Sequence, residues 1–337
     1  MKLAFIIDPI ELLDPGHDTS VALMEAAQLK GHHILITQIE QLTIVRGKAY
    51  ALLTPVKLTP VKLVDKHYVI AQQWYELDTP QWLPLEEMDI VWMRKDPPVD
   101  TAYLYATYIL DLVDPGKTKI LNRPDGLRNA NEKIYALQFS SLMPETIVTQ
   151  DHRVISDFVK THGEAILKPL NGKGGEGILY LCEGDRNINS LIEISTKKNK
   201  EPVMIQAYLP AAVEGDKRII ILNGEPIGAI NRVPHGGEFR GNMAVGGKVT
   251  KIEITEREYE ICSQMSAKFR EDGLYFVGID VIGGYLTEVN VTSPTGVREI
   301  DRFNNTLLGL KVMEWLEDSQ DIKNACTFST DLANPYL

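Results

Sequence analysis

One short stretch near the C-terminal end of the chain combines oxygen-bearing side chains with the pattern of a β-hairpin. In FVGIDVIGGYLTEVN, Asp280 precedes a pair of glycines, and Glu288 and Asn290 follow it. Because side chains alternate along a strand, Glu288 and Asn290 share one face of the sheet. If the loop is 283–285 with a bulge, Asp280 lies directly opposite Glu288. Two carboxylates and an amide oxygen on one patch are suitable ligands for Mg2+.

The same three side chains could instead belong to a polar, solvated sheet face. Their neighbours in the two strands are apolar, namely Val281, Leu286, Val289 and Val291. Carboxylates among such neighbours cost several kcal/mol unless they are paired or bound to a metal. We therefore favour the metal site.

A glycine-rich segment upstream is suited to holding phosphate groups. EAILKPLNGKGGEGILYL predicts a strand, a loop with glycines at 172, 174, 175 and 177, and a second strand. Glycines let backbone N–H groups approach phosphate oxygens closely. The loop does not match the Walker pattern and no helix is expected after it, so it is neither a P-loop nor a Rossmann turn. On its own, such a hairpin is either a phosphate-binding loop or simply a turn.

Two further segments could serve the same ligand. Lys168 ends the strand before the glycine-rich loop, where it either directs its charge toward phosphates or is an ordinary solvated lysine. The apolar strand in PVMIQAYLP (202–210) either presents backbone groups to an adenine edge or is a plain core strand.

Three arginines lie on or beside one predicted hairpin and the loop that follows it: Arg218, Arg232 and Arg240. The planar guanidinium fork of arginine binds carboxylate or phosphate groups in a bidentate manner. Residues 234–247 hold five glycines, so this loop is either a lid over a site or a plain flexible loop.

Composition narrows the class of protein. The 337 residues are 44% hydrophobic and 24% charged, which is typical of a globular chain with two or three packed units. The net charge of -11 makes the chain a poor binder of nucleic acid, and an anionic substrate would need a local cluster of Lys and Arg. The three cysteines show no spacing typical of a disulfide framework or zinc site. Without a signal peptide or membrane-span pattern, we expect a soluble cytoplasmic protein.

The hydrophobic pattern predicts the elements that must position these residues. In the first part of the chain we expect strands at 2–8, 33–39, 89–94 and 119–121 and helices at about 18–30 and 100–112. The β-α-β opening is typical of an open α/β sheet. Between 47 and 82 the pattern is weak, and the prolines of a tandem LTPVK repeat indicate a loop or an edge strand.

After a boundary near 122–124 the pattern becomes α+β. We expect a helix containing Asn131, Glu132 and Lys133, further helices at about 153–162 and 255–270, and strands at 145–149, 164–169 and 178–182. Hairpin turns are predicted at Asn223-Gly224 and at Gly283-Gly284. The polar tail after Asp318 is expected to be loosely held.

Together these segments resemble the ATP-grasp superfamily and, more closely, the bacterial glutathione synthetases. The resemblance runs to about residue 317 and rests on stretches such as DPI (8–10), MRKDPP (93–98), NEK (131–133), GDKR (215–218) and TEVNVTSPT (287–295). It implies an α/β fold, with an N-terminal open α/β (pre-ATP-grasp) domain followed by a two-part ATP-grasp fold of α+β subdomains. The implied units are a substrate domain at 1–122, a lid subdomain at 123–201, a catalytic subdomain at 202–318 and a polar tail at 319–337.

The resemblance also implies roles for particular residues. ATP would be held by Lys133, Lys168, Gly172, Gly174, Gly175, Asp216 and backbone groups of Gln206, Ala207, Tyr208 and Leu209. Mg2+ or Mn2+ would be carried by Asp280, Glu288 and Asn290. The reacting acyl phosphate would be surrounded by Arg218, Arg232, Arg240 and Asn290. The peptide substrate would meet Ser293 and Thr295, with Ser20, Arg94 and Asn122 as further contacts in the N-terminal domain.

The activity implied by the resemblance is the ATP-dependent ligation of γ-L-glutamyl-L-cysteine to glycine through an acyl phosphate. The partners would be these small molecules, with neither nucleic acid nor membrane, and relatives are commonly homo-tetramers.

Lys173 departs from the apolar residue that relatives have at this position and adds a charge to the glycine-rich loop.

Three other functions are compatible with parts of the sequence. A different ATP-grasp carboxylate–amine ligase would share the nucleotide half and differ in the 8–122 and 290–298 segments. A binding module without catalysis would lack a metal ligand or a phosphate-binding lysine, whereas all of these are present. A dehydrogenase would fit the β-α-β opening, but the first strand–helix turn lacks GxGxxG.

Overall fold

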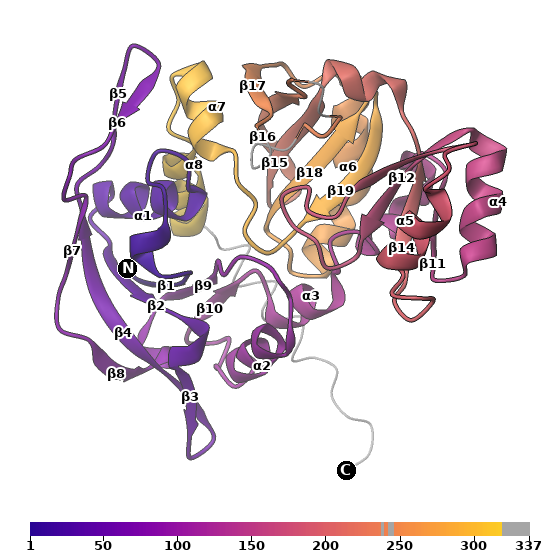
Figure 1. The fold of residues 1–337 in the computed structure, drawn as a ribbon. Coiled ribbons are helices and arrows are strands. Elements are labelled where there is room, and N and C mark those ends of the chain that lie inside the picture. Colours follow the sequence, from indigo (N-terminus) through magenta and orange to yellow (C-terminus); the bar gives the residue numbers. More distant parts are fainter. Residues whose placement is uncertain (237–238, 242–245, 319–337) are drawn as a thin grey trace.

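The chain forms three main sheets, one after another along the sequence, in a computed structural model that describes residues 1–236, 239–241 and 246–318 (Figure 1). The expected α/β class is confirmed. The first and third sheets lie within the predicted units 1–122 and 202–318, whereas the second sheet includes the strand Val203–Ala207, which follows the predicted boundary at 201. The unit boundaries stay a prediction. The predicted tail at 319–337 lies outside the described residues.

The N-terminal sheet is built around four parallel strands. Its strand order is β10-β9-β1-β2-β4-β3, and β7 and β8 also pair with β4. The strands are β1 (Lys2–Ile6), β2 (His33–Thr37), β3 (Leu42–Val45), β4 (Lys48–Leu58), β7 (Tyr75–Leu77), β8 (Gln81–Pro84), β9 (Ile90–Met93) and β10 (Lys119–Leu121). The predicted helices are α1 (Thr19–Leu29), whose N-cap Asp18 accepts from Val21 N, and α2 (Thr101–Leu110).

The weakly patterned region 47–82 differs from the expectation of a loop or edge strand. The first LTPVK copy lies inside β4, which pairs with β2 on one side and with β7 and β8 on the other. Pro55 pairs with Leu35 of β2, and on the opposite side it lies between the β7 and β8 pairings. An inner strand therefore tolerates the proline, because its missing N–H falls where the ladder is already interrupted.

The second sheet is a small antiparallel unit with two helices on it. Its order is β11-β14-β12-β13, with β11 (Thr146–Thr149), β12 (Glu164–Pro169), β13 (Leu179–Cys182), β14 (Val203–Ala207), α4 (His152–His162) and α5 (Ile188–Ser195). A separate apolar core lies between the sheet and helices and includes Ile155, Phe158, Leu167 and Ile205. This unit lies at the edge of the molecule in Figure 1 and carries the glycine-rich loop between β12 and β13.

The third sheet is antiparallel and has the order β17-β16-β15-β18-β19. Its elements are β15 (Asp216–Leu222), β16 (Glu225–Val233), β17 (Lys248–Lys251), β18 (Phe276–Ile282), β19 (Tyr285–Asn290) and α6 (Glu256–Glu271). Both predicted hairpins are present. The predicted helix start is confirmed too, because Thr255 and Glu258 form a capping box at the N-terminus of α6.

The chain then returns to the N-terminal unit through α7 (Val297–Asn304) and α8 (Leu308–Asp318), which lie beside α1 in Figure 1. A Cβ on Gly309 of α8 would lie 2.8 Å from Ala26 Cβ, so the two helices approach closely at this point. The remaining elements are short: β5 (Lys62–Val64), β6 (His67–Val69), α3 (Pro124–Asn129), and 3-10 turns at Ile10–Leu12, Ile39–Gln41, Leu85–Glu87, Tyr135–Leu142 and Pro210–Glu214.

The β18–β19 hairpin confirms the predicted pairing of Asp280 with Glu288 but corrects its cause. Ile282 pairs with Tyr285, so the turn consists of Gly283 and Gly284 alone and not of 283–285. Without an irregularity, a two-residue turn would set Asp280 opposite Thr287. The register shifts between Asp280 and Val281, which leaves Thr287 as the extra residue of a bulge. The bulge therefore brings the two carboxylates face to face.

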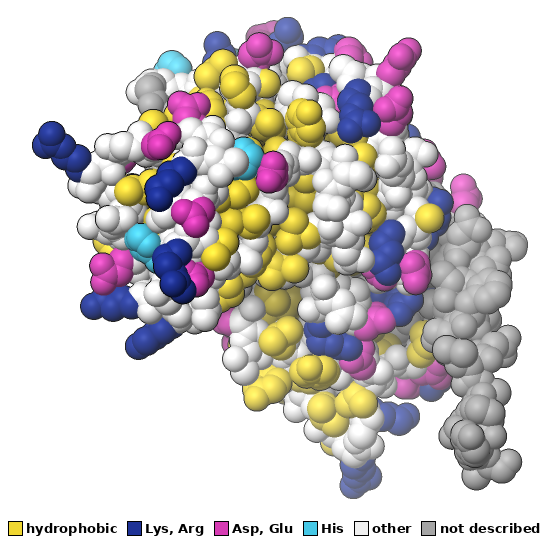
Figure 2. Space-filling view, turned by 90° about the vertical axis from the view of Figure 1, so that its right-hand side faces the viewer, with side chains coloured by type: hydrophobic (Ala, Val, Ile, Leu, Met, Phe, Trp, Pro, Cys, Tyr) yellow, Lys and Arg dark blue, Asp and Glu magenta, His cyan; other side chains and the backbone are white. Residues whose placement is uncertain are grey.

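Charged side chains of both signs are interspersed over the face shown in Figure 2.

Asn122 joins the N-terminal unit to the third sheet. Its Nδ2 donates to the carbonyl oxygens of Phe276 and Val291, each at 2.9 Å, and its Oδ1 accepts from Phe276 N at 2.9 Å. The side chain is buried. Its hydrogen bonds therefore fix the end of the N-terminal unit to the start of β18 and to the residue after β19.

We predict that Asn122→Ala lowers the thermal midpoint of unfolding, because three buried backbone groups lose their partner. Leaving buried polar groups unsatisfied costs about 1–3 kcal/mol each, so a fall in Tm of on the order of 5 °C or more is expected for a chain of this size. Differential scanning calorimetry measures it, with Asn129→Ala on the exposed side of α3 as the control. Equal midpoints for both variants would contradict this structural role of Asn122.

Candidate active site

A cavity of ≈ 670 Å³ lies where the three units meet. The N-terminal unit contributes His17, Asp96 and Pro97, and the second unit contributes the glycine-rich loop. The third unit contributes its arginines, Glu288, Asn290 and the segment 292–295. A narrower cleft of ≈ 80 Å³ between the second and third sheets shares Ile178, Arg240 and Glu288 with it. The two spaces form adjoining parts of one site.

The glycine-rich loop adopts a backbone that its glycines permit. Gly174, Gly175 and Gly177 have positive φ values of 60°, 87° and 68°. A Cβ on Gly172 would lie 2.8 Å from the carbonyl oxygen of Glu176. The loop leads directly into β13, as expected for a hairpin and unlike a P-loop.

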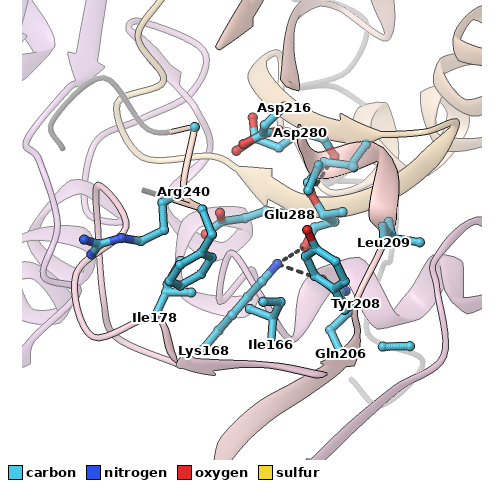
Figure 3. A pocket seen from close by; sticks show the side chains of 16 residues that line it. Ile166, Lys168, Ile178, Gln206, Tyr208, Leu209, Asp216, Arg240, Asp280 and Glu288 are labelled. Carbon is cyan, nitrogen blue, oxygen red and sulfur yellow. Dashed lines mark hydrogen bonds between the residues drawn. The ribbon is translucent and has the colours of Figure 1, made fainter. Parts of the chain in front are cut away.

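Lys168 is buried at the floor of the narrow cleft (Figure 3). Its Nζ donates to Gln206 Oε1 at 2.7 Å and to the carbonyl oxygen of Thr287 at 3.4 Å. Burial lowers the pKa of this lysine, and Glu288 and Asp216 partly offset the shift. The interpretation of Lys168 as an ordinary solvated lysine is therefore wrong, because the ammonium is held inside the molecule among polar groups.

The strand in 202–210 ends at this cleft, as expected for an adenine contact. Gln206, Ala207, Tyr208 and Leu209 all line it, together with Ile166, Ile178 and Lys168. Figure 3 shows Lys168, Tyr208 and Gln206 around the same space. A slot with apolar walls from Ile166, Ile178 and Leu209 is suited to a flat heteroaromatic ring. The nucleotide role of these residues stays a prediction.

One carboxylate, Asp280, organises the centre of the site. Arg218 binds it in a bidentate manner, with Nε–Oδ1 at 2.5 Å and Nη2–Oδ2 at 3.0 Å. Arg232 Nη2 lies 2.9 Å from Asp280 Oδ2 and 2.5 Å from Asp216 Oδ2. Burial alone would raise the pKa of Asp280, but the two guanidinium groups outweigh it and hold that pKa well below its usual range.

The pKa of Asp216 shifts in the opposite direction to that of Asp280. Burial and the neighbouring charge of Asp280 raise the pKa of Asp216 to about 6, although Arg232 opposes this shift. Asp216 Oδ1 is buried and, within the described ranges, has no hydrogen-bond partner. An acceptor oxygen is thus available beside Asp280 in the narrow cleft.

Glu288 faces Lys133 across the site. Lys133 Nζ lies 3.0 Å from Glu288 Oε1 and donates to the carbonyl oxygen of Gly172 at 2.8 Å. Lys133 thus contacts both the hairpin and the glycine-rich loop. The expected helix over 131–133 is wrong: these residues form a turn between α3 and the 3-10 segment Tyr135–Leu142, because Asn131 Oδ1 accepts from the backbone N–H groups of Lys133 and Ile134.

Glu132 is a site residue that reasoning from the sequence missed. Its Oε1 accepts from Val291 N, Thr292 N and Thr292 Oγ1 at 3.0, 3.2 and 2.9 Å. It therefore anchors the turn that carries Lys133 to the segment after β19. The NEK motif (131–133) contains this residue, and its contacts with Val291 and Thr292 are a signal that a single sequence does not carry.

The residues present fit a divalent cation. Asp280, Glu288 and Asn290 lie on one face of the hairpin, with Asn290 Nδ2 3.4 Å from Asp280 Oδ2. Nearby, the buried Oδ1 of Asp216 has no hydrogen-bond partner among the residues that the structure describes. Hard oxygen donors of this kind suit Mg2+ or Mn2+. In the protein alone the carboxylates are paired with Arg218, Arg232 and Lys133, which explains how they tolerate burial.

The three predicted catalytic arginines all line the large cavity, but only two of them share a partner. Arg218 and Arg232 both bind Asp280, and Arg218 Nη1 also donates to the carbonyl oxygen of Thr295 at 3.2 Å. Arg240 lies on the glycine-containing loop after β16, and its guanidinium points away from Asp280 in Figure 3. Its Nη1 donates to the carbonyl oxygen of Gly175 at 2.8 Å, so the two loops touch. Part of the predicted lid, 237–238 and 242–245, lies outside the described residues.

The predicted substrate contacts separate into two groups. Ser293 and Thr295 line the large cavity. Ser20, Arg94 and Asn122 are buried: Arg94 Nε donates to Ser20 Oγ at 3.1 Å and its Nη2 to the carbonyl oxygen of Pro294 at 3.2 Å. These three side chains have structural partners of their own, and their contact with substrate stays a prediction.

Comparisons with known proteins agree with this site. Residues 1–128 match the model of the prokaryotic glutathione synthetase N-terminal domain, and residues 132–305 match that of the prokaryotic glutathione synthetase ATP-grasp domain. The glutathione synthetase of Thermosynechococcus vestitus is 66% identical over 94% of this chain and 99% of its own length. That of Synechocystis sp. is 61% identical over 94% and 99%.

Solved structures share the fold at much lower identity. The macrocyclase MdnC bound with precursor peptide MdnA from Microcystis aeruginosa superposes with a TM-score of 0.61 at 16% identity, over 95% of this chain and 100% of that chain. This likeness shows a shared fold, and the family follows from the sequence matches over both halves. The chain belongs to the prokaryotic glutathione synthetase family.

Proposed function

We propose that this chain, an ATP-dependent ligase of the glutathione synthetase family, joins γ-L-glutamyl-L-cysteine to glycine through an acyl phosphate. The observation that carries the proposal is the large cavity, because it is lined by the glycine-rich loop, Lys133, the three arginines and Asn290 together. Such a space can hold a triphosphate end and a carboxylate side by side.

The first step of the proposed reaction transfers a phosphoryl group. A cysteinyl carboxylate oxygen attacks the γ-phosphorus of ATP, the bond from that phosphorus to the β–γ bridging oxygen breaks, and ADP leaves. Lys133 and Lys168 bind the phosphates, and the loop over 172–177 covers them. Because a carboxylate and a triphosphate repel each other, the arginines must neutralise both before they can approach.

The second step forms the amide bond. The amine of glycine attacks the carbonyl carbon of the acyl phosphate, the C–O bond to phosphate breaks, and the amine releases a proton. Arg218 and Arg232 are fixed beside the reaction by Asp280 and stabilise the oxyanion and the departing phosphate. An acyl phosphate hydrolyses in water, so the contact between Arg240 and Gly175 serves to close the two loops over it.

Asp280, Glu288 and Asn290 would hold Mg2+ or Mn2+, which when bound neutralises charge on the β- and γ-phosphate oxygens. With the ion bound, Lys133 would turn from Glu288 toward the phosphates, while Asp280 would keep its pairing with Arg218 and Arg232.

We further propose a cytoplasmic homo-oligomer, a tetramer by resemblance, that acts on these small molecules alone. In the described part of the chain, no helix has the length and apolar character to cross a bilayer. The remaining alternative is an ATP-grasp ligase for other amino acids, since the nucleotide half of the site would be the same.

The reaction is tested by measuring phosphate release from ATP. We expect release that requires γ-L-glutamyl-L-cysteine and glycine together, with glutathione formed in equal amount. Release that instead follows another amino-acid pair would support the alternative ligase and contradict the substrate assignment.

We predict that Glu288→Gln weakens the dependence on Mg2+. Loss of one anionic ligand should raise the Mg2+ concentration for half-maximal activity by roughly tenfold or more, because charge and ligand number set affinity for this ion. Titration of activity with Mg2+ at saturating ATP measures the shift. The control is Glu193→Gln, an exposed carboxylate on α5; a normal Mg2+ titration of Glu288→Gln would remove it from the metal site.

We predict that Arg240→Ala lowers kcat by about 100-fold while the KM for ATP changes little, since removal of one charge-stabilising donor typically costs this much. Steady-state kinetics with ATP as the varied substrate separates the two quantities. Arg153→Ala, an exposed arginine on α4, should match the unmodified chain. Unchanged turnover in Arg240→Ala would exclude it from the mechanism.

A further inference from the structure

One wall of the large cavity is formed by a single continuous stretch of the chain. After the candidate metal ligand Asn290, the backbone runs through Ser293 to α7, whose first turn contains Glu299. Two side chains of the N-terminal unit contact this segment and also line the cavity: Asp96 meets Ser293, and His17 meets Glu299. The metal end of the site and these two side chains are thus ordered along one stretch of backbone.

Asp96 is a carboxylate that an ammonium can reach from the cavity. Its Oδ1 accepts a short hydrogen bond from Ser293 Oγ, and its Oδ2 lies 3.4 Å from the ammonium of Lys173. The side chain is 45% exposed. A bound ammonium of a substrate could therefore take the place that Lys173 has beside Oδ2.

His17 complements Asp96 with positive charge. Its Nδ1 lies 2.6 Å from Glu299 Oε1, and this hydrogen bond raises the pKa of His17. The imidazolium form is thereby favoured, with Nε2 as the second N–H donor. Among the described residues Nε2 has no hydrogen-bond partner, and the ring is 39% exposed. The ring thus offers a charged donor for a carboxylate.

We infer that Asp96 and His17 recognise the free amino-acid end of the γ-glutamyl group, Asp96 binding its α-ammonium and His17 its α-carboxylate. This inference rests on the proposed function and assigns residues to the end of the dipeptide that does not react. A γ-linked glutamyl group differs from other acyl groups by carrying both charges on one carbon. A protein carboxylate and a protein cation placed side by side can bind these two charges together and so recognise a γ-glutamyl group.

The length of the substrate agrees with this placement. In an extended dipeptide, the α-carbon of the γ-glutamyl group lies about 7 Å from the cysteinyl carboxyl carbon, from standard bond lengths. The backbone from Asn290 to Ser293 spans at most about 10 Å. With the reacting carboxylate near Asn290, the amino-acid end therefore falls beside Ser293 and Asp96, toward His17.

The test uses two analogues that each lack one charge. N-glutaryl-L-cysteine lacks the α-ammonium, and N-(4-aminobutanoyl)-L-cysteine lacks the α-carboxylate. Asp96→Asn and His17→Gln are compared with the unmodified chain by phosphate release, with ATP and glycine saturating. Asp157→Asn and His33→Gln, exposed and remote from the cavity, are the matched controls.

We expect a crossed pattern in kcat/KM. Asp96→Asn should lose roughly 10- to 100-fold with the two ammonium-bearing dipeptides and be unchanged with N-glutaryl-L-cysteine. His17→Gln should lose a similar factor with the two carboxylate-bearing dipeptides and be unchanged with N-(4-aminobutanoyl)-L-cysteine. The loss should fall on KM for the dipeptide and leave KM for ATP unchanged.

Other outcomes overturn the inference. Equal losses with all three dipeptides would mean that the side chains act through the fold. Lys173→Ala should keep the selectivity of the unmodified chain; if it reproduces the effect of Asp96→Asn, then Asp96 serves to hold the glycine-rich loop and not the substrate. An unmodified chain that ignores γ-L-glutamyl-L-cysteine altogether would instead refute the proposed function, so the two failures are distinguishable.

Discussion

The whole site depends on a buried carboxylate held between two guanidinium groups. Asp280 alone in this position would cost several kcal/mol of desolvation, and Arg218 and Arg232 offset that cost by pairing with it at 2.5–3.0 Å. The arginines stabilise the buried carboxylate, and the carboxylate in turn fixes the orientation of the arginines before any ligand binds. Charges that are oriented in advance need no reorganisation when an oxyanion forms, and this is the main source of electrostatic catalysis.

The geometry of the β18–β19 hairpin determines which side chains share the face of Asp280. A two-residue glycine turn would by itself place Thr287 opposite Asp280 and turn Glu288 toward the other face of the sheet. The bulge at Thr287 restores Glu288 to the face of Asp280, and it leaves the Thr287 carbonyl oxygen within 3.4 Å of Lys168 Nζ. One extra residue in one strand therefore positions both the proposed metal ligands and Lys168, as bulges beside active sites often do.

Local patterns were enough to predict most elements and the family. Alternation and capping signals marked β1, α1, α6 and both hairpins, because these depend on neighbouring residues in the chain. Two local predictions were wrong for identifiable reasons. The side chain of Asn131 caps its own backbone and turns 131–133 away from a helix, and β4 continues through Pro55 because its partners break there. Single-sequence patterns do not contain either fact.

The sequence alone could not reveal the hydrogen bonds that join the units. Asn122 bonds to Val291, Glu132 to Thr292, and Asp96 to Ser293, although each pair is more than a hundred positions apart. All of these contacts meet the segment that follows β19, where the chain leaves the third sheet and returns to the N-terminal unit. The segment NVTSPT thus has a structural role in addition to its predicted contact with substrate. Because the same backbone also ties the units together, a movement of the N-terminal unit would displace Val291, which directly follows the proposed metal ligand Asn290.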